Sequence, residues 1–463
     1  MNRDTMKKFL RVCFLICIGF LLACRGAETP MPTALTATTA PTLNITAQFA
    51  ATAAPTGNIT EQFTATIAPA ETQTITPLPR ATNTTTIPAA TIAPTLAKTP
   101  TIPAPATRTT LTGSAREFTR LMIDAEKHPK AKCNDGTTPL FFLQRGKDDG
   151  ADKWVLYFKG GGACSSKTAC EQRERGLTSA TPWLARNPGL RGADEEGIDG
   201  ILSDNPAHNP DFYNWNHVFM VYCSSDLWAG TRAASDESFG WYCAGHYIAD
   251  AFMDALADEA IVGAQNLAQA KQILVTGSSA GGFGVHNNID RMAERFHDAD
   301  VRAVSDAAVA NFASVATTGE LGGGRQEQWN LWQPRYDESC MTANADAPWI
   351  CRDGDFLASQ NHITTPMFIH ADQLDPVLAG AMGLDPRKRD DRARMLENAA
   401  GLRALLQNEP AAFSPFNGKH VGLTNERFYG YKINGLTLFQ VLGNWYFQRS
   451  GPVNVIEAPR PLR

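Results

Sequence analysis

The stretch "LVTGSSAGGFG", residues 274–284, passes from apolar residues into a cluster of small ones. The residues "QILVT" at its start are typical of a buried strand, and "GVHNNIDRMAERF" after it fits a helix. Between them, "GSSAG" at 277–281 matches G-x-S-x-G with Ser279 at the centre. In this setting the pattern predicts a nucleophile elbow, a strained turn that exposes the central hydroxyl at a helix start. A plain glycine-rich turn is the alternative.

The neighbours of Ser279 have separate expected roles. The glycines of the turn are needed because side chains there would collide with the adjoining strand and helix. The amide of Ala280 would point at an oxyanion, and Ser278 would face into the turn as a structural residue.

Short β-branched or aromatic runs alternate with helix-like stretches along the chain. In the stretch 247–270, apolar residues recur in steps of three and four, which is the pattern of an amphipathic helix. Such alternation predicts an α/β fold, mainly a parallel sheet with helices on both faces. The strand-like runs are at 154–158, 217–222, 272–277, 301–306 and 366–370.

A serine nucleophile requires a base and an orienting acid, and in α/β-hydrolases the chain order is Ser, acid, His. The segment "PMFIHADQLDPVLAG" from 366 places Asp372 and Asp375 just after a strand. We select Asp375, which lies further into the loop, with Asp372 second. Asp306, at the end of the run 301–306, is a third candidate and fits a structural carboxylate better.

The chain contains a single histidine after Asp375, namely His420. His420 is therefore the base by elimination if the acid lies late in the chain. With Asp306 as the acid, His362 and His370 would qualify again. A loop histidine without a catalytic role is the alternative for His420.

A second oxyanion donor is expected from "WVLYFKGGGAC", residues 154–164, where glycines follow a strand. Amides of Gly161 and Gly162 could approach a substrate closely because no Cβ intervenes. A phosphate-binding loop fits poorly, since neither G-x-G-x-x-G nor GK[ST] follows. A structural tight turn remains the alternative.

The net charge of −5 and the pI of about 6 do not indicate a nucleic-acid partner. No CxxC motif or His/Cys cluster with zinc spacing is present, so we expect no metal, and the chemistry requires no cofactor. We expect a monomer.

The N-terminus resembles a bacterial lipoprotein signal peptide. Basic residues among the first eleven precede the apolar "VCFLICIGFLLA", which is too short to span a bilayer, and "LLAC" ends at Cys24. We expect a signal peptide over 1–23 and lipid on Cys24; an ordinary signal peptide is the alternative. Both predict export. Residues 24–112 are rich in Thr, Ala and Pro and predict a disordered tether. The catalytic domain is then 113–463.

Of the ten cysteines, seven would remain in the exported domain, and most should pair. Cys164 with Cys170 and Cys340 with Cys351 would close short local loops. The odd count leaves one thiol over.

Several motifs, among them "CNDGTTPLFFL" at 133, "WVLYFKGGGAC" at 154 and the serine turn, resemble the pectin acetylesterase and Notum family of serine carboxylesterases. The likeness continues at 200–230 and 438–449. It implies an extracellular α/β-hydrolase that removes an acyl group from a sugar or protein hydroxyl.

Carried over residue by residue, the resemblance implies Ser279 as nucleophile, His420 as base and Asp375 as acid. It also implies a Cys164–Cys170 bridge, one between Cys133 and Cys223, and Cys243 as the odd thiol. Lys159 and Ala163 depart from the family pattern, which usually has an acidic residue and a tryptophan there.

We expect a membrane-anchored esterase on the cell surface that deacetylates a polysaccharide. A long-acyl deacylase and a non-catalytic glycan-binding lipoprotein are the alternatives. Trp215, Trp228 and Trp241 lie in expected insert loops and are candidates to stack on sugar rings or to pack internally.

Overall fold

The computed structural model describes residues 117–185, 189–190, 198–312, 320–385 and 387–460. The expected signal peptide (1–23), Cys24 and the expected tether (24–112) lie outside the described residues, as do residues 113–116 of the expected domain.

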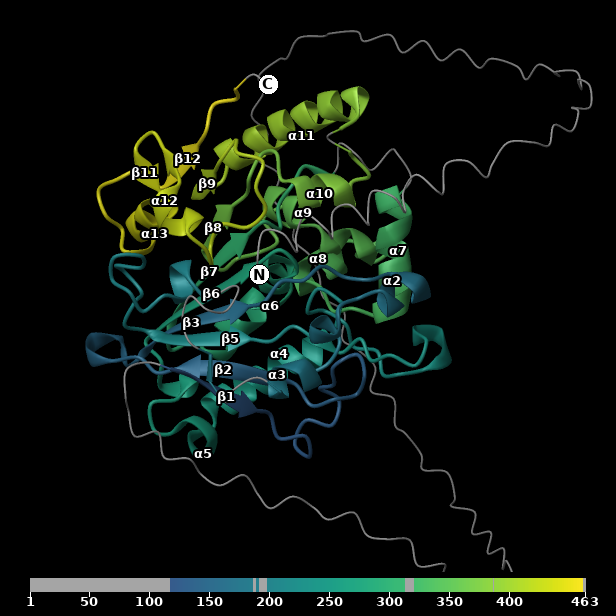
Figure 1. The fold of residues 1–463 in the computed structure, drawn as a ribbon, viewed down its shortest axis with the longest axis vertical. Helices are drawn as coiled ribbons and strands as arrows, with labels where there is room; N and C mark the ends of the chain where they lie inside the picture. Colours follow the sequence, from purple (N-terminus) through teal and green to yellow (C-terminus); the bar gives the residue numbers. More distant parts are fainter. Residues whose placement is uncertain (1–116, 186–188, 191–197, 313–319, 386, 461–463) are drawn as a thin grey trace, which may run out of the picture. The chain divides into compact units, whose positions relative to one another are not determined.

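A ten-stranded sheet forms the centre of the domain, in the order β12-β9-β8-β7-β6-β3-β5-β2-β1-β4 (Figure 1). The strands from β12 to β5 pair in parallel, and β2, β1 and β4 are antiparallel. The strands of this sheet are β1 (Phe118–Met122), β2 (Leu140–Gln144), β3 (Lys153–Phe158), β4 (Gly189–Leu190), β5 (Asn216–Met220), β6 (Gln272–Ser278), β7 (Asp300–Asp306), β8 (Met367–His370), β9 (Ala412–Ser414) and β12 (Asn454–Ile456). The expectation of a mainly parallel α/β sheet is confirmed.

Helices lie between most of these strands, and a small hairpin, β10 (Lys432–Ile433) with β11 (Leu436–Thr437), lies near the C-terminus. The helices are α2 (Lys167–Glu171), α3 (Thr181–Leu184), α4 (Gly245–Ala257), α5 (Glu259–Val262), α6 (Ala280–Arg295), α7 (Glu320–Trp332), α8 (Glu338–Ala343), α9 (Gly354–Ser359), α10 (Pro376–Ala381), α11 (Arg389–Gln407), α12 (Arg427–Gly430) and α13 (Leu438–Tyr446).

The helix-like stretch 247–270 is interrupted in the structure. The helix α4 ends at Ala257, and Asp258 adopts an extended backbone conformation. The carboxylate of Asp258 accepts the Ala260 amide and caps the short α5. Local capping therefore divides a segment whose apolar spacing continues.

Helices cover both faces of the sheet. Phe368 on β8 contacts Trp445 of α13, with ring centroids 5.8 Å apart. Its neighbour Ile369 packs with Leu402 and Leu406 of α11. Because successive strand residues point to opposite faces, α13 and α11 lie on opposite sides of the sheet.

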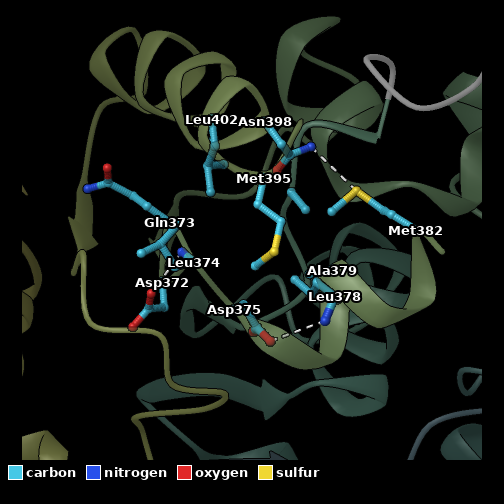
Figure 2. A pocket seen from close by; sticks show the side chains of 11 residues that line it. Asp372, Gln373, Leu374, Asp375, Leu378, Ala379, Met382, Met395, Asn398 and Leu402 are labelled. Carbon is cyan, nitrogen blue, oxygen red and sulfur yellow. Dashed lines mark hydrogen bonds between the residues drawn. The ribbon is translucent and has the colours of Figure 1, made fainter. Parts of the chain in front are cut away.

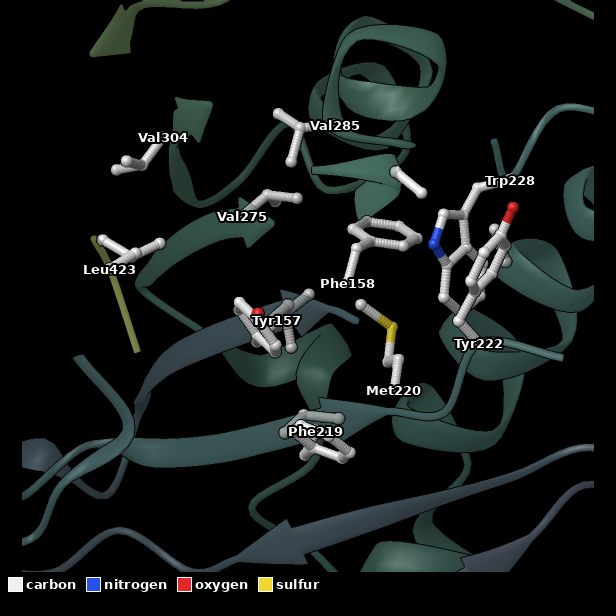
Figure 3. Packing of buried hydrophobic residues seen from close by; sticks show 14 of the residues in the cluster. Tyr157, Phe158, Phe219, Met220, Tyr222, Trp228, Val275, Val285, Val304 and Leu423 are labelled. Atoms are coloured by element: carbon white, nitrogen blue, oxygen red, sulfur yellow. The ribbon is translucent and has the colours of Figure 1, made fainter. Parts of the chain in front are cut away.

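Aromatic packing holds the loop after β5 against the end of β3. The ring centroids of Phe158 and Trp228 are 4.9 Å apart, and those of Tyr222 and Trp228 are 5.2 Å apart (Figure 3). The Trp228 indole also donates to the Lys159 carbonyl at 3.1 Å. Trp228 and Trp215 are buried, which excludes the sugar-stacking role considered for them, and Trp241 is half-buried.

Three disulfides join Cys133 to Cys223, Cys164 to Cys170 and Cys340 to Cys351. Cys243 is a buried free thiol. Three disulfides are typical of proteins outside the reducing cytosol. Within the described ranges, no helix is long and apolar enough to cross a bilayer.

Candidate active site

The chain makes a sharp corner at Ser279. The strand β6 ends at Ser278, α6 begins at Ala280, and Ser279 between them has φ 58° and ψ −124°. A non-glycine residue at positive φ is strained, and such strain is found at functional sites. The conformation is held because the Ser279 amide donates to the Asp306 carbonyl at 2.8 Å. The half-buried Ser279 thus sits at the N-terminus of a long helix.

Two glycines allow the corner to pack closely. A Cβ atom on Gly281 would lie 1.9 Å from the Phe158 carbonyl oxygen. One on Gly160 would lie 2.4 Å from the Ser278 carbonyl oxygen and 3.0 Å from the Ser279 Cβ. The serine turn and the glycine loop after β3 therefore touch, and neither position has room for a side chain.

The two serines of the turn have different surroundings. Ser278 is 2% exposed, and its hydroxyl donates to Asp306 at 2.5 Å. Both serines line an open cavity that also contains His420, and Ser279 is the more exposed of the two. Because the Ser278 hydroxyl is already bonded to Asp306, Ser279 is the serine available for chemistry.

Asp375 and His420 form a hydrogen-bonded pair. The distance between Asp375 Oδ2 and His420 Nδ1 is 2.6 Å, and Asp375 is 5% exposed. The other carboxylate oxygen accepts the amides of Val377 and Leu378 at the start of α10, which fixes its orientation (Figure 2). Because Nδ1 faces the carboxylate, Nε2 of His420 remains available on the other side of the ring.

Asp372 binds the backbone of the loop that carries His420 (residues 417–423, here called the histidine loop), whereas the imidazole of His420 bonds Asp375. The Asp372 carboxylate accepts the amides of Gly418 at 3.0 Å and Lys419 at 3.1 Å. Burial raises the pKa of Asp372 despite these hydrogen bonds. Asp372 and Asp375 flank a void of about 10 Å³ closed by α11, too small for a substrate (Figure 2).

The third candidate acid, Asp306, pairs with His370 at 2.6 Å, and both side chains are buried. The ring of His362 is instead hydrogen-bonded to the Ser339 hydroxyl at 2.9 Å. Neither His362 nor His370 lines the cavity that contains Ser279.

Two features constrain the backbone at His420. Val421 has φ 46°, which is unusual for a β-branched residue. The Arg427 guanidinium donates to the carbonyls of His420 and Val421 at 3.1 and 2.9 Å. These bonds fix the loop that presents the imidazole.

The open cavity has a volume of about 590 Å³, within the range of small-molecule sites. Charged and apolar side chains share its lining. The charged residues are Lys159, Glu174 and Arg427; the apolar ones are Leu177, Phe219, Val377 and Val421.

The glycine loop presents backbone amides to this cavity. Gly161 and Gly162 have φ 147° and 66°, and their amides have no acceptor among the described residues. The amide of Ala280, the first residue of α6, has no intrahelical partner either. Arg173 orients the loop by donating to the Gly161 carbonyl at 2.6 Å and to the Ser225 hydroxyl at 2.6 Å.

A family model described as Pectinacetylesterase matches residues 114–378. The chain belongs to the pectinacetylesterase family. This confirms the resemblance read from the motifs.

Relatives in the family carry two kinds of name. A Drosophila melanogaster protein named palmitoleoyl-protein carboxylesterase Notum is 29% identical over 337 residues, which are 68% of this chain and 46% of that protein. Pectin acetylesterase 4 of Arabidopsis thaliana is 25% identical over 364 residues, 72% of this chain and 84% of that protein. The chain spans less than two thirds of the first relatives that it matches, with 46%, 60% and 63% of their lengths.

The structure of the Wnt deacylase Notum from Drosophila matches with a TM-score of 0.64 and 27% identity. The match covers 74% of this chain and 97% of the other. The fold is therefore the Notum-like α/β-hydrolase fold of the pectinacetylesterase family.

Sequence reasoning missed the two arginines of the site. Arg173 and Arg427 act on backbone carbonyls, and no sequence motif predicts such contacts. Lys159, which departs from the usual family pattern, lines the cavity, and its ammonium donates to the Gly160 carbonyl at 3.2 Å.

Proposed function

We propose that this chain is a serine carboxylic ester hydrolase that removes acyl groups, acetyl above all, from sugar hydroxyls. Ser279 is the nucleophile, His420 the base and Asp375 the acid. The observation that carries the proposal is the Asp375–His420 pair, whose imidazole lines the same cavity as the strained Ser279.

In the first step, His420 Nε2 takes the proton of Ser279 Oγ as that oxygen attacks the ester carbonyl carbon. Asp375 keeps the imidazole in the tautomer with its proton on Nδ1 and stabilises the imidazolium that forms. The alcohol leaves with the proton from His420, and the acyl group stays on Ser279.

The oxyanion of the tetrahedral intermediate accepts hydrogen bonds from the amides of Gly161 or Gly162 and Ala280. Losing one such donor costs about 3 kcal/mol of transition-state stabilisation. Water, activated by His420, then releases the acid and restores Ser279. No step of this sequence calls on a metal or an organic cofactor.

The polar part of the cavity supports a hydrophilic alcohol. Lys159, Glu174 and Arg427 offer hydrogen-bonding partners of the kind that sugar hydroxyls and acids use. The name of the Arabidopsis relative, pectin acetylesterase, agrees with an acylated polysaccharide as substrate.

A second candidate function, removal of a long acyl chain from a protein or lipid, is favoured by the size of the cavity. About 590 Å³ exceeds the need of an acetyl group, and Leu177, Phe219, Val377 and Val421 give apolar lining. The Drosophila relative is named for a palmitoleoyl-protein ester. A third reading, a glycan-binding protein without turnover, would leave the Asp375–His420 pair without a use.

Hydrolysis of p-nitrophenyl esters from acetate to palmitate separates these functions. We expect the highest kcat/KM with acetate, loss of turnover in Ser279→Ala, and about a tenth of the activity in Ser278→Ala. A maximum at eight carbons or more would replace deacetylation by the long-acyl reading. A folded protein inactive on every ester would favour the binding protein.

We also propose that the protein is exported and anchored by lipid on Cys24, with 1–23 as signal peptide, 24–112 as tether and 113–463 as a monomeric catalytic domain. The lipobox and the three disulfides support this. In a bacterial host, the full chain should enter the membrane fraction and incorporate labelled palmitate, and Cys24→Ser should do neither. Membrane association that survives Cys24→Ser would disprove the anchor.

A further inference from the structure

Three residues at the carboxyl end of the sheet form a hydrogen-bonded row. Ser278, Asp306 and His370 are register partners on β6, β7 and β8. Asp306 lies between the other two: it accepts the Ser278 hydroxyl at 2.5 Å, and its other oxygen is 2.6 Å from His370 Nδ1. The row therefore links the residue before Ser279 to the strand that leads into the acid loop.

The histidine loop is attached to the same carboxylate. The amides of Gly422 and Leu423, two and three residues after His420, donate to Asp306 at 3.2 and 3.0 Å. A Cβ on Gly422 would lie 2.6 Å from His370 Cε1, so the loop packs directly on the row. The Asp306 side chain therefore binds residues next to the proposed nucleophile, Ser279, and residues next to the proposed base, His420.

The main chain of Asp306 adds a further contact. Its carbonyl oxygen accepts the Ser279 amide at 2.8 Å, at the strained corner itself. Asp306 is fully buried. Burial by itself would raise its pKa, but the charge of His370 and the hydrogen bonds from His370, Ser278 and Leu423 outweigh burial and lower the pKa. Asp306 is therefore held as an anion whose acceptors are all used.

We propose that Asp306 is a positioning residue that fixes Ser279 and His420 relative to each other, with Ser278 and His370 as its partners. The inference rests on the proposed function. Asp306 does not touch the cavity; it acts through the turn and through the histidine loop. A misplacement of about 1 Å at such a contact costs about 100-fold in rate.

The variant Asp306→Asn tests this without changing the size of the side chain. Its amide group turns one acceptor into a donor, so the Ser278 hydroxyl or the loop amides lose their partner. We expect a loss of kcat of about 100-fold with KM within threefold, because Asp306 itself does not line the cavity that binds the substrate. A kcat within threefold of the wild type would overturn the proposal.

Asp290→Asn is the matched control. Asp290 lies on the same helix, α6, and its carboxylate accepts the amides and hydroxyls of Thr364 and Thr365. This variant also removes hydrogen bonds between α6 and the loop before β8, but these hydrogen bonds lie far from Ser279. We expect its kcat within twofold of the wild type. An equal loss in both variants would mean that general loosening, rather than positioning, lowers the rate.

Labelling with a p-nitrophenyl phosphonate separates this proposal from the proposed function. Wild type should be labelled on Ser279, and Asp306→Asn should be labelled about 100-fold more slowly while circular dichroism shows it folded. Equal labelling rates would overturn the positioning role alone. A wild type that neither hydrolyses esters nor reacts would overturn the proposed function, and the positioning role with it.

The double variant Ser278→Ala with Asp306→Asn tests the link between the two residues. If Ser278 acts through Asp306, the double variant should be no slower than Asp306→Asn. Multiplied losses would show that Ser278 acts independently and would remove it from the proposed row.

Discussion

Asp375 Oδ2 lies 2.6 Å from His420 Nδ1, while Asp375 Oδ1 caps α10 through the amides of Val377 and Leu378. The Asp375 carboxylate therefore caps the N-terminus of α10 and also orients the imidazole of His420. Among the described residues, the hydrogen bonds of the neighbouring Asp372 carboxylate go to backbone amides of the histidine loop and of its own turn. The two aspartates, three residues apart, have different roles.

Asp375→Asn should lower kcat by roughly 10³- to 10⁴-fold, because the asparagine amide favours the wrong imidazole tautomer. Asp372→Asn should lower the melting temperature and change kcat by less than tenfold. Ester hydrolysis and thermal unfolding of both variants check this. The reverse order of the kcat losses would assign the acid to Asp372.

Removal of one disulfide should mainly lower stability, and removal of another should mainly lower activity. Cys133–Cys223 closes 90 residues and Cys164–Cys170 closes six, which corresponds to about 5 and about 2 kcal/mol of loop entropy. Replacing the first pair by serines should cause the larger loss in urea stability. Replacing the second pair, beside the glycine loop, should cause the larger loss in kcat, roughly tenfold. Equal effects on kcat would show that the bridge does not support the loop.

Arg173→Lys should lower kcat by about 10- to 100-fold with little change in KM. A lysine cannot bond the Gly161 carbonyl and the Ser225 hydroxyl together in a fixed plane, so the loop amides lose their alignment. Steady-state kinetics test this, with Arg175→Lys at an exposed position as the control. A change confined to KM would instead place Arg173 in substrate binding.

Asp226 should make stability fall as the pH rises. Burial raises its pKa to about 6, although Ser224, Gly245 and Trp228 donate to it. Between the unfolded value near 4 and about 6, the folded state binds the extra proton, so the free energy of unfolding decreases with pH, by about 3 kcal/mol.

Asp226→Asn lacks this titration. The difference in unfolding free energy between wild type and variant, measured in urea from pH 4 to pH 7, should therefore change across that window. A constant difference would contradict the raised pKa of Asp226.

The β-branched or aromatic runs at 154–158, 217–222, 272–277, 301–306 and 366–370 predicted strands that the structure contains, because strands buried in a parallel sheet are rich in such residues. The antiparallel strands β1 and β2 were not predicted. Phe118–Met122 contains Thr119 and Arg120, which weaken its apolar pattern, and Leu140–Gln144 pairs with the distant β5 (Asn216–Met220). Long-range pairing, rather than local composition, decides such strands.

The residue types of the proposed site could be read from the chain, since the G-x-S-x-G pattern points to Ser279 and the chain order Ser, acid, His points to a late aspartate and His420. Tertiary structure decided between Asp375 and Asp372 as the partner of the imidazole, because both follow the same strand and only their orientation differs. It also brought Asp306 into contact with the serine turn and Arg173 into contact with the glycine loop. These contacts join residues about 10 to 120 positions apart, and the folded backbone alone brings them within hydrogen-bonding distance.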